Sequence, residues 1–309
     1  MKTPNVVGRL VDRLDGLLVP LVVIVGAVGV ALPGPGRAVD HSAAIDPTLA
    51  VMVLTAGLSI EAAQLRQLRA RRARIGLTLA ATTTLLPLLA WALSRAATGG
   101  TRQAILAAGV APSEVASISL TGLAGGEIPV AAALLIASSL ITVVTAGPIL
   151  GLLAHTPNLH PTGLLATLAA VVAAPLAAGA VLRPLLQKAE PAADAARLLG
   201  SVTLLVLLWE VASQVRLEAS YLLATGLLAG YLLGAASIGA IVTHGLDTAG
   251  KPGLLLPVAM RDFAVAAGVA AAAFGPASTG PLGIYGLLVL LFGALTARWG
   301  TRAPKPHQS

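Results

Sequence analysis

Residues 253 to 268 read Gly253-Leu-Leu-Leu-Pro257-Val-Ala-Met260-Arg261-Asp262-Phe-Ala-Val-Ala-Ala-Gly268. An arginine and an aspartate stand side by side in a segment that is otherwise apolar enough to cross a bilayer. A charge that faces lipid at that depth costs at least roughly 2.5–3.5 kcal/mol, so this pair is expected to face a cavity inside the protein. Pro257 removes a backbone donor one turn before the charges. The segment is therefore predicted to be a broken helix that lines a functional site.

The composition of the whole chain is that of a membrane protein. Hydrophobic residues make up 56% of the 309 positions and charged residues only 11%, against about a quarter in soluble domains. Long apolar runs recur from end to end, which predicts spanning helices rather than strands. The net charge of +7 does not indicate a nucleic-acid partner, because many of the arginines cluster between positions 66 and 74, in one loop that positive-inside topology explains.

The motifs that carry enzymatic chemistry are missing from the sequence. There is no cysteine, which excludes disulfides and thiolate metal sites. No segment resembles a phosphate-binding loop, a zinc-binding helix or a nucleophile elbow. We therefore predict no enzyme activity, no catalytic residue, no metal site and no cofactor.

The apolar segments predict an all-α integral membrane protein with ten transmembrane helices in a single domain. Most of the 20 lysines and arginines fall on one side of these segments, which places both termini in the cytoplasm. Five helices per half is an odd number, so the halves, about 16–154 and 162–297, are predicted to be inverted repeats. The predicted segments are 16–32, 45–60, 75–94, 103–125, 129–154, 162–186, 198–213, 219–242, 253–275 and 281–296.

The fourth and ninth predicted segments occupy matching positions in the two halves. Each carries a proline and ionisable residues near its middle, at Pro112-Ser-Glu114 and at Pro257 to Asp262. Interrupted helices at matching positions of two repeats point to the binding site of a secondary transporter. These two helices are predicted to cross near the membrane midplane.

Hydroxyl side chains follow the first break. Ser113, Ser117 and Thr121 recur every four residues, so they are expected to form one stripe on a helix. Glu114 is expected at the N-terminus of that helix, where the macrodipole favours a carboxylate. In one interpretation, the stripe lines a polar path and Glu114 binds a cation or a proton. In the other, the hydroxyls bond to their own helix, Ser113 is its N-cap and Glu114 only complements the dipole.

The neighbours Arg261 and Asp262 also have two interpretations. On a regular helix their side chains would point about 100° apart and could not pair, so only an unwound stretch would bring them together. In the functional interpretation, Arg261 binds an anionic substrate or acts as a tethered cation, and Asp262 exchanges a proton. In the structural one, the two charges pin a helix crossing. Asp247, in the glycine-rich loop before this segment, is expected to be solvated.

Four short motifs occur in order along the chain. They are Gly57-Leu-Ser-Ile-Glu61 with Leu65-Arg66; Leu86-Pro87-Leu-Leu-Ala-Trp91-Ala-Leu; Ala111-Pro112-Ser-Glu-Val-Ala116-Ser117 with Thr121, Leu123-Ala124 and Gly126; and Val258-Ala-Met260 with Ala264-Val-Ala-Ala-Gly268 to Phe274. In order and spacing they resemble the bile acid:sodium symporter family. The resemblance covers nearly the whole chain and implies a ten-helix inverted-repeat fold whose fourth and ninth helices cross at the substrate site.

Most positions that carry sodium coupling in that family differ here. The family's Ser-Asn pair after the first break corresponds to Ser117-Ile118, and two downstream hydroxyl positions correspond to Ala131 and Leu135. Ser117 alone is equivalent. One hydroxyl cannot hold a sodium ion that needs several oxygen ligands, so a complete sodium site is not expected.

The remaining family positions fall on residues of different chemistry. The Glu of the ninth helix corresponds to Pro257, its Gln-Asn pair to Arg261-Asp262, and the Gln of the third helix to Thr82. We therefore expect Arg261 to place a permanent positive charge near the position that sodium ions occupy in relatives.

These features predict a secondary transporter of the bacterial inner membrane that moves a small organic anion by alternating access. The predicted substrate-binding residues are Arg261, Asp262, Ser113, Ser117, Thr121 and Thr82, and the predicted ion- or proton-coupling residues are Glu114 and Asp262. The expected partners are the organic anion, the lipid bilayer and protons. The alternatives are an uncoupled uniporter or exporter, and a membrane sensor or scaffold that keeps the fold without transport.

Overall fold

A computed structural model gives the fold and describes residues 6–34, 41–58, 71–154, 161–186, 190–213, 215, 219–247 and 250–300. Over these residues the chain is helical and contains no β-strand. The helices are α1 (Val6–Ala31), α3 (His41–Leu58), α5 (Arg72–Ser94), α6 (Gly99–Val110), α7 (Ala116–Leu123), α8 (Ile128–Ala154), α9 (Pro161–Leu168), the π-helix η2 (Ala169–Ala173), α10 (Ala174–Leu186), α11 (Glu190–Ala212), α12 (Ala219–Val242), α13 (Gly250–Ala259), α14 (Phe263–Phe274), the 3₁₀-helix η3 (Pro276–Ser278) and α15 (Gly280–Gly300).

Several of these helices can cross a bilayer. In the part of the chain that the structure describes, five are long and apolar enough, namely Arg72–Ser94, Ile128–Ala154, Thr162–Leu186, Tyr221–Val242 and Pro276–Arg298. Many large apolar side chains on their outer faces are exposed, as for Leu88 of α5 and Val144 of α8. A bilayer is the solvent in which such a surface is stable, so the protein is a multi-pass membrane protein.

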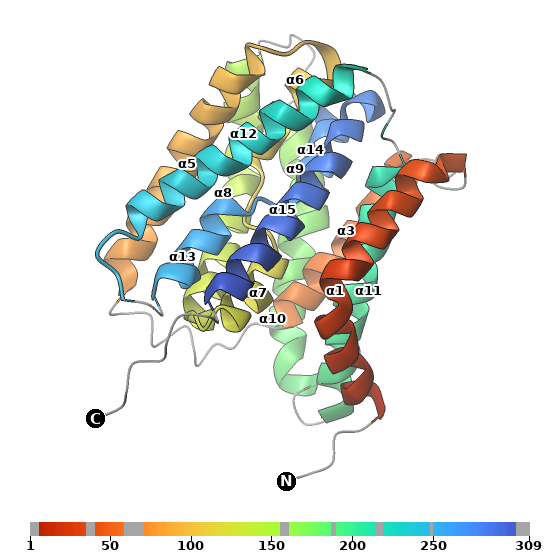
Figure 1. The fold of residues 1–309 in the computed structure, drawn as a ribbon, viewed down its shortest axis with the longest axis vertical. Coiled ribbons are helices and arrows are strands. Elements are labelled where there is room, and N and C mark those ends of the chain that lie inside the picture. The colour runs from red at the N-terminus through yellow and green to blue at the C-terminus, as the bar shows by residue number, and fades with distance from the viewer. Residues whose placement is uncertain are drawn as a thin grey trace.

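The helices form two groups (Figure 1). The first group consists of α1, α3, α10 and α11. In the second group, α5 and α6 pack against α8 and α12, and α13 packs against both α8 and α12. The C-terminal helices join the groups: α14 packs against α3 and α6, and α15 packs against α11 and α12.

Glycines let two helices of the first group touch backbone to backbone. A Cβ atom on Gly57 of α3 would overlap the carbonyl oxygen of Leu176, and one on Gly179 of α10 would overlap that of Leu54. Small residues at the interface are the usual way in which membrane helices approach closely, because lipid supplies no hydrophobic force between them.

Two predicted segments are broken into pairs of helices. α6 ends at Val110 because Ala111 precedes Pro112, which disfavours helical torsions, and Ala111 is extended, with φ −63° and ψ 152°. In the other segment α13 continues through Pro257 and ends at Ala259, so the break lies three residues later than the proline. Both predicted interruptions are confirmed, with that shift.

A third irregularity was not predicted. The segment 162–186 contains the π-helix η2, which lies immediately before Ala174 and Pro175. Pro175 has no N–H to offer the carbonyl of Val171 four residues earlier, and a π-turn is a common way for a helix to absorb such a gap.

Candidate functional site

The two breaks cross and are joined by backbone hydrogen bonds. The N–H of Glu114 donates to the carbonyl of Met260, and the N–H of Asp262 donates to the carbonyl of Pro112, each over 2.9 Å. These bonds take up donors and acceptors that a broken helix would otherwise leave unpaired in a membrane interior. The predicted crossing of the two interrupted helices is therefore present in the structure.

The crossing separates its side chains onto two faces. Ser113 and Arg261 are directly opposite each other in an antiparallel bridge. Because side chains of an extended chain alternate, these two share one face, and Glu114 and Asp262 lie on the other. The guanidinium is thus on the opposite face from the two carboxyls.

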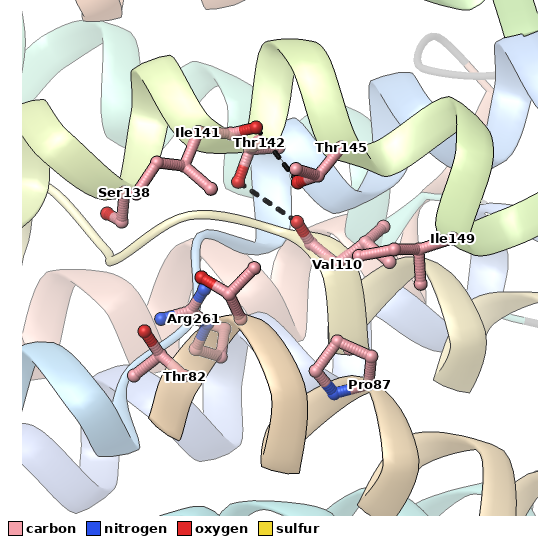
Figure 2. Close-up of a pocket in the computed structure, with 11 residues that line it drawn as sticks. Thr82, Pro87, Val110, Ser138, Ile141, Thr142, Thr145, Ile149 and Arg261 are labelled. Carbon is pink, nitrogen blue, oxygen red and sulfur yellow. Dashed lines mark hydrogen bonds between the residues drawn. The ribbon is translucent and has the colours of Figure 1, made fainter. Parts of the chain in front are cut away.

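Arg261 is almost completely buried, at 3% exposure. Its Nη2 donates to the carbonyl of Ala111, whereas Nε and Nη1 have no hydrogen-bond partner. The guanidinium lines a pocket between α5, α6 and α8 (Figure 2), whose other lining residues are Thr82, Thr83, Pro87, Gly109, Val110, Ser138, Ile141, Thr142, Thr145 and Ile149. A cation with unused donors in a wall of hydroxyl oxygens can bind a small polar ligand.

Asp262 has a structural task in this conformation. Its Oδ1 accepts from the N–H groups of Ala264 and Val265, each over 2.9 Å, and so caps the N-terminus of α14. Although the break allows an ion pair between the neighbours, the described ion pairs do not include one between Asp262 and Arg261. The cap uses Oδ1 and leaves Oδ2 available for a second partner.

Glu114 is also buried, at 0% exposure. Its Oε1 accepts from the N–H of Ala116 over 3.5 Å, at the start of α7, where the sequence predicted it. Its Oε2 has no hydrogen-bond partner, and the carboxyl lies close enough to that of Asp262 for the two to interact electrostatically. Two carboxyls at this depth cannot both be charged at low cost, so one of them is suited to holding a proton.

The predicted hydroxyl stripe needs a correction. Ser113 does not lie on α7, because the backbone of the crossing keeps residues 111–115 out of the helix, and α7 begins at Ala116. Ser113 instead lies next to Ser138 of α8, whose hydroxyl is 3.2 Å from its own. Ser117 and Thr121 do lie on α7; Ser117 Oγ has no partner, and Thr121 donates to the carbonyl of Pro252 over 3.3 Å.

The pocket brings together residues that sequence reasoning found and others that it missed. Thr82 was predicted, and it lines the pocket while donating to the carbonyl of Leu79 over 3.0 Å. The hydroxyls of Ser138, Thr142 and Thr145 from α8 were missed. Their spacing of four and three residues places them on one helical face, but it does not indicate which segment that face contacts.

Sequence reasoning also missed two tyrosines, Tyr231 and Tyr285, that lie near Arg261. The rings of Tyr231 and Tyr285 pack with centroids 5.9 Å apart, and both side chains are fully buried. Tyr231 donates to the carbonyl of Ala108 over 3.2 Å, while the hydroxyl of Tyr285 has no partner. All three tyrosines of the chain lie within predicted apolar segments, and a tyrosine hydroxyl in such a segment usually needs a polar partner, which was a usable signal.

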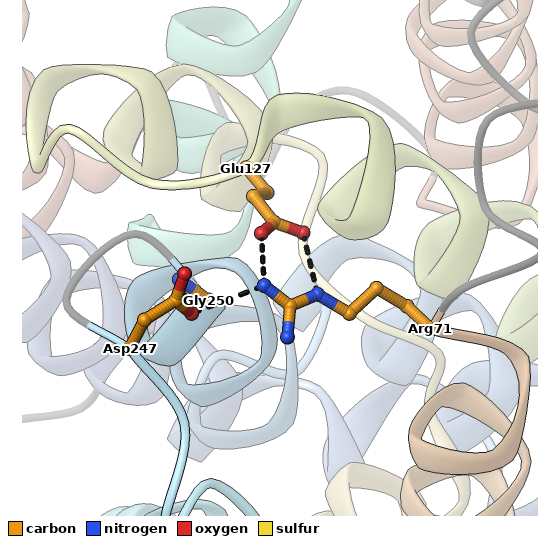
Figure 3. Close-up of polar contacts among 4 residues, drawn as sticks. All are labelled: Arg71, Glu127, Asp247 and Gly250. Carbon is orange, nitrogen blue, oxygen red and sulfur yellow. Dashed lines mark hydrogen bonds and ion pairs between the residues drawn. The ribbon is translucent and has the colours of Figure 1, made fainter.

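Polar side chains form a second cluster near the N-terminal ends of α5, α8 and α13 (Figure 3). Arg71 donates through Nε and Nη2 to the two carboxylate oxygens of Glu127, over 3.2 and 2.5 Å, and Nη2 also lies 3.0 Å from Asp247 Oδ1. Asp247 in turn accepts from the N–H of Gly250. The hydrogen bonds with Glu127 raise the pKa of Arg71. Asp247 is therefore not merely solvated, as the sequence suggested, but helps to tie the start of α13 to α5 and α8.

Among the described residues, no three or more His, Cys, Asp or Glu side chains are grouped so that they could hold a metal ion. At the crossing, Arg261 donates to the carbonyl of Ala111 and shares its pocket with several hydroxyl side chains.

A sequence model of the sodium bile acid symporter family matches residues 46–225, which is more than half of the 309-residue chain. The chain belongs to this family. Among curated proteins, none matches it.

The match to the sodium bile acid symporter family covers one half of the crossing and not the other. It includes the break at Pro112 and the pocket residues of α5, α6 and α8. It ends before Arg261 and Asp262, so the second half of the crossing lies outside the matched range. The family is one of transporters, and the crossing of two broken helices is the arrangement with which a transporter can bind its substrate.

Proposed function

We propose that the protein is a secondary transporter that carries a small organic anion across the inner membrane by alternating access. In this proposal the helices form ten spans in two inverted repeats, with both termini in the cytoplasm, and the two helix groups of Figure 1 move against each other. Family membership supports the transport class, and the crossing supports the position of the site.

One observation supports an anionic substrate. Arg261 is buried beside the crossing, with Nε and Nη1 free of hydrogen-bond partners. A carboxylate or sulfonate can accept from two guanidinium N–H groups at once, and such a bidentate pair of opposite charges is stronger than a hydrogen bond between neutral groups. The guanidinium is permanently charged, so it favours an anion at every physiological pH.

The coupling ion proposed is the proton. Arg261 places a fixed positive charge among the hydroxyls of Thr82 and Ser138 and the carbonyl of Ala111, the type of oxygen-lined space in which a sodium ion would otherwise bind. A second cation there would be repelled. Glu114 and Asp262 on the opposite face supply carboxyls that can take up a proton.

The test uses purified protein reconstituted into liposomes. A thermal-shift screen of carboxylates and sulfonates first identifies ligands, since compounds that bind only the folded form raise its stability. Uptake of each hit is then measured under a proton gradient, a sodium gradient and no gradient. We expect uptake that a proton gradient accelerates and a sodium gradient leaves nearly unchanged. Binding without any flux would contradict transport, and a steep dependence on sodium would contradict the role of Arg261 as a tethered cation.

A further inference from the structure

We propose that the pocket beside Arg261 is a binding site for a small inorganic anion of the halide class, with chloride as the physiological ion. The inference shares Arg261 with the proposed function, but it does not require transport of any organic anion. It concerns the ion that neutralises this guanidinium when no substrate headgroup is bound.

The first argument is the state of the guanidinium. Arg261 is 3% exposed, and of its donor nitrogens only Nη2 is bonded, to a neutral carbonyl at Ala111. A buried charge that is neither paired nor fully hydrogen-bonded costs several kcal/mol, and an arginine cannot escape that cost by losing its proton. An anion within reach of Nε and Nη1 would remove most of this cost.

The second argument is that the protein itself supplies no such anion on this face. Asp262 attracts Arg261 through space, but its carboxyl caps α14 from the other face of the crossing. Glu114 lies on that other face as well. The residues that line the pocket with Arg261 include no acidic side chain.

The third argument is the chemistry and size of the pocket. Figure 2 shows Ser138, Thr142 and Thr145 of α8 along one wall, with Thr82 of α5 near Arg261 on the other. A hydroxyl can rotate its proton from a helix carbonyl toward a ligand, so these groups can donate to an anion. Only about 10 Å³ is open to the centre of a water molecule, which is near the minimum for one water-sized particle.

This size selects among anions. A single-atom anion is only slightly larger than water and fits after small side-chain adjustments. The carboxylate or sulfonate of an organic substrate is polyatomic and would need a wider pocket than this one. The halide and the substrate headgroup would therefore compete for Arg261 in different conformations of the protein.

The test measures halide binding by the purified full-length protein in detergent. Thermal stability is titrated with sodium chloride and sodium bromide at constant ionic strength, and bromide is located in crystals by its anomalous scattering. We expect a saturable stabilisation by both halides and a bromide peak within hydrogen-bond distance of Arg261.

Three variants make the test specific. Arg261→Gln removes the charge and should weaken halide binding by about tenfold or more, because a charge-assisted hydrogen bond contributes roughly 1.5–3 kcal/mol. Arg261→Lys keeps the charge and should retain part of the affinity. Arg95→Gln, which removes an exposed cation over Trp91 at the C-terminal end of α5, should bind halide as the wild type does.

Each outcome decides the proposal. No bromide peak at Arg261, or equal stabilisation of wild type and Arg261→Gln by halide when both variants fold, overturns the halide site. That result would leave the transport proposal intact, because organic-anion uptake is measured separately. Halide binding that depends on Arg261 in a protein with no uptake of any organic anion would support this site and count against the transport function.

Discussion

The N–H of Asp262 donates to the carbonyl of Pro112 over 2.9 Å, and the carboxyl of Asp262 caps α14. One residue therefore completes the crossing with its backbone and starts the following helix with its side chain. Any test of Asp262 must separate the cap from a role in proton exchange.

Replacing Asp262 with alanine should lower the stability of the folded protein. The change removes an acceptor for two N–H groups at the start of α14, and loss of an N-cap costs about 0.5–2 kcal/mol. Asp262→Asn keeps a capping oxygen and should be nearly as stable as the wild type. Thermal denaturation in detergent measures both. If Asp262→Asn is as unstable as Asp262→Ala, charge rather than capping geometry is what the site requires.

Replacing Arg261 with glutamine should abolish substrate uptake while the protein stays folded. Glutamine can still donate to the carbonyl of Ala111, but it has no charge for an anionic substrate. We expect transport to fall at least about tenfold, in keeping with the loss of one charged hydrogen bond or more. Liposome uptake with size-exclusion chromatography as the folding control is the measurement. A Gln variant that transports at the wild-type rate would remove Arg261 from the site.

The sequence was sufficient to locate the crossing, for physical reasons. Arg261, Asp262 and Glu114 are too costly to expose to lipid, and the residue before Pro112 cannot easily be helical. These are local constraints, and the structure satisfies them with two breaks joined by backbone bonds. Their location needed no knowledge of the rest of the fold.

The parts that sequence reasoning missed depend on which segments become neighbours. Ser113 leaves the predicted stripe because it pairs with Arg261, a partner far away in the chain. Ser138 and Thr142 become part of the site only because α8 packs against the end of α6, where Thr142 donates to the carbonyl of Val110 over 3.1 Å. Hydroxyls that can bond to their own helix give no sequence signal of such a neighbour.

The contact between α3 and α10 predicts an unusual sensitivity to one methyl group. Gly57→Ala should destabilise the protein by about 1–3 kcal/mol, as overpacking does, because the new Cβ would overlap the carbonyl of Leu176. Gly226→Ala in α12 is the matched control, since no atom lies within 4 Å of its added Cβ. That control should be neutral or up to about 1 kcal/mol more stable, because alanine is the better helix former. Equal midpoints of thermal denaturation for the two variants would show that α3 and α10 do not pack so closely.

The ion pairs of Arg71 with Glu127 and Asp247 should contribute modestly to the stability of the folded protein, and this contribution should depend on salt. Arg71→Gln breaks the paired bonds to Glu127 and the contact with Asp247, but all three side chains are partly exposed, so the expected loss is about 1 kcal/mol or less. Arg72→Gln, at the exposed neighbouring position, should have a smaller effect. High salt should shrink the difference between the two variants. A difference that persists unchanged in high salt would mean that packing, not charge, accounts for it.

Glu114 allows proton coupling to be tested without removing the fold. Its carboxyl is fully buried, and Oε2 has no partner, so the isosteric and neutral Glu114→Gln should fold at least as well as the wild type. If Glu114 carries the coupled proton, this variant should still bind the substrate but lose the acceleration of uptake by an inward proton gradient. Glu127→Gln, in the partly exposed cluster with Arg71, is the control and should keep that acceleration. Should Glu114→Gln respond to the gradient as the wild type does, the proton must be carried elsewhere, and Asp262 on the same face of the crossing is the next residue to test.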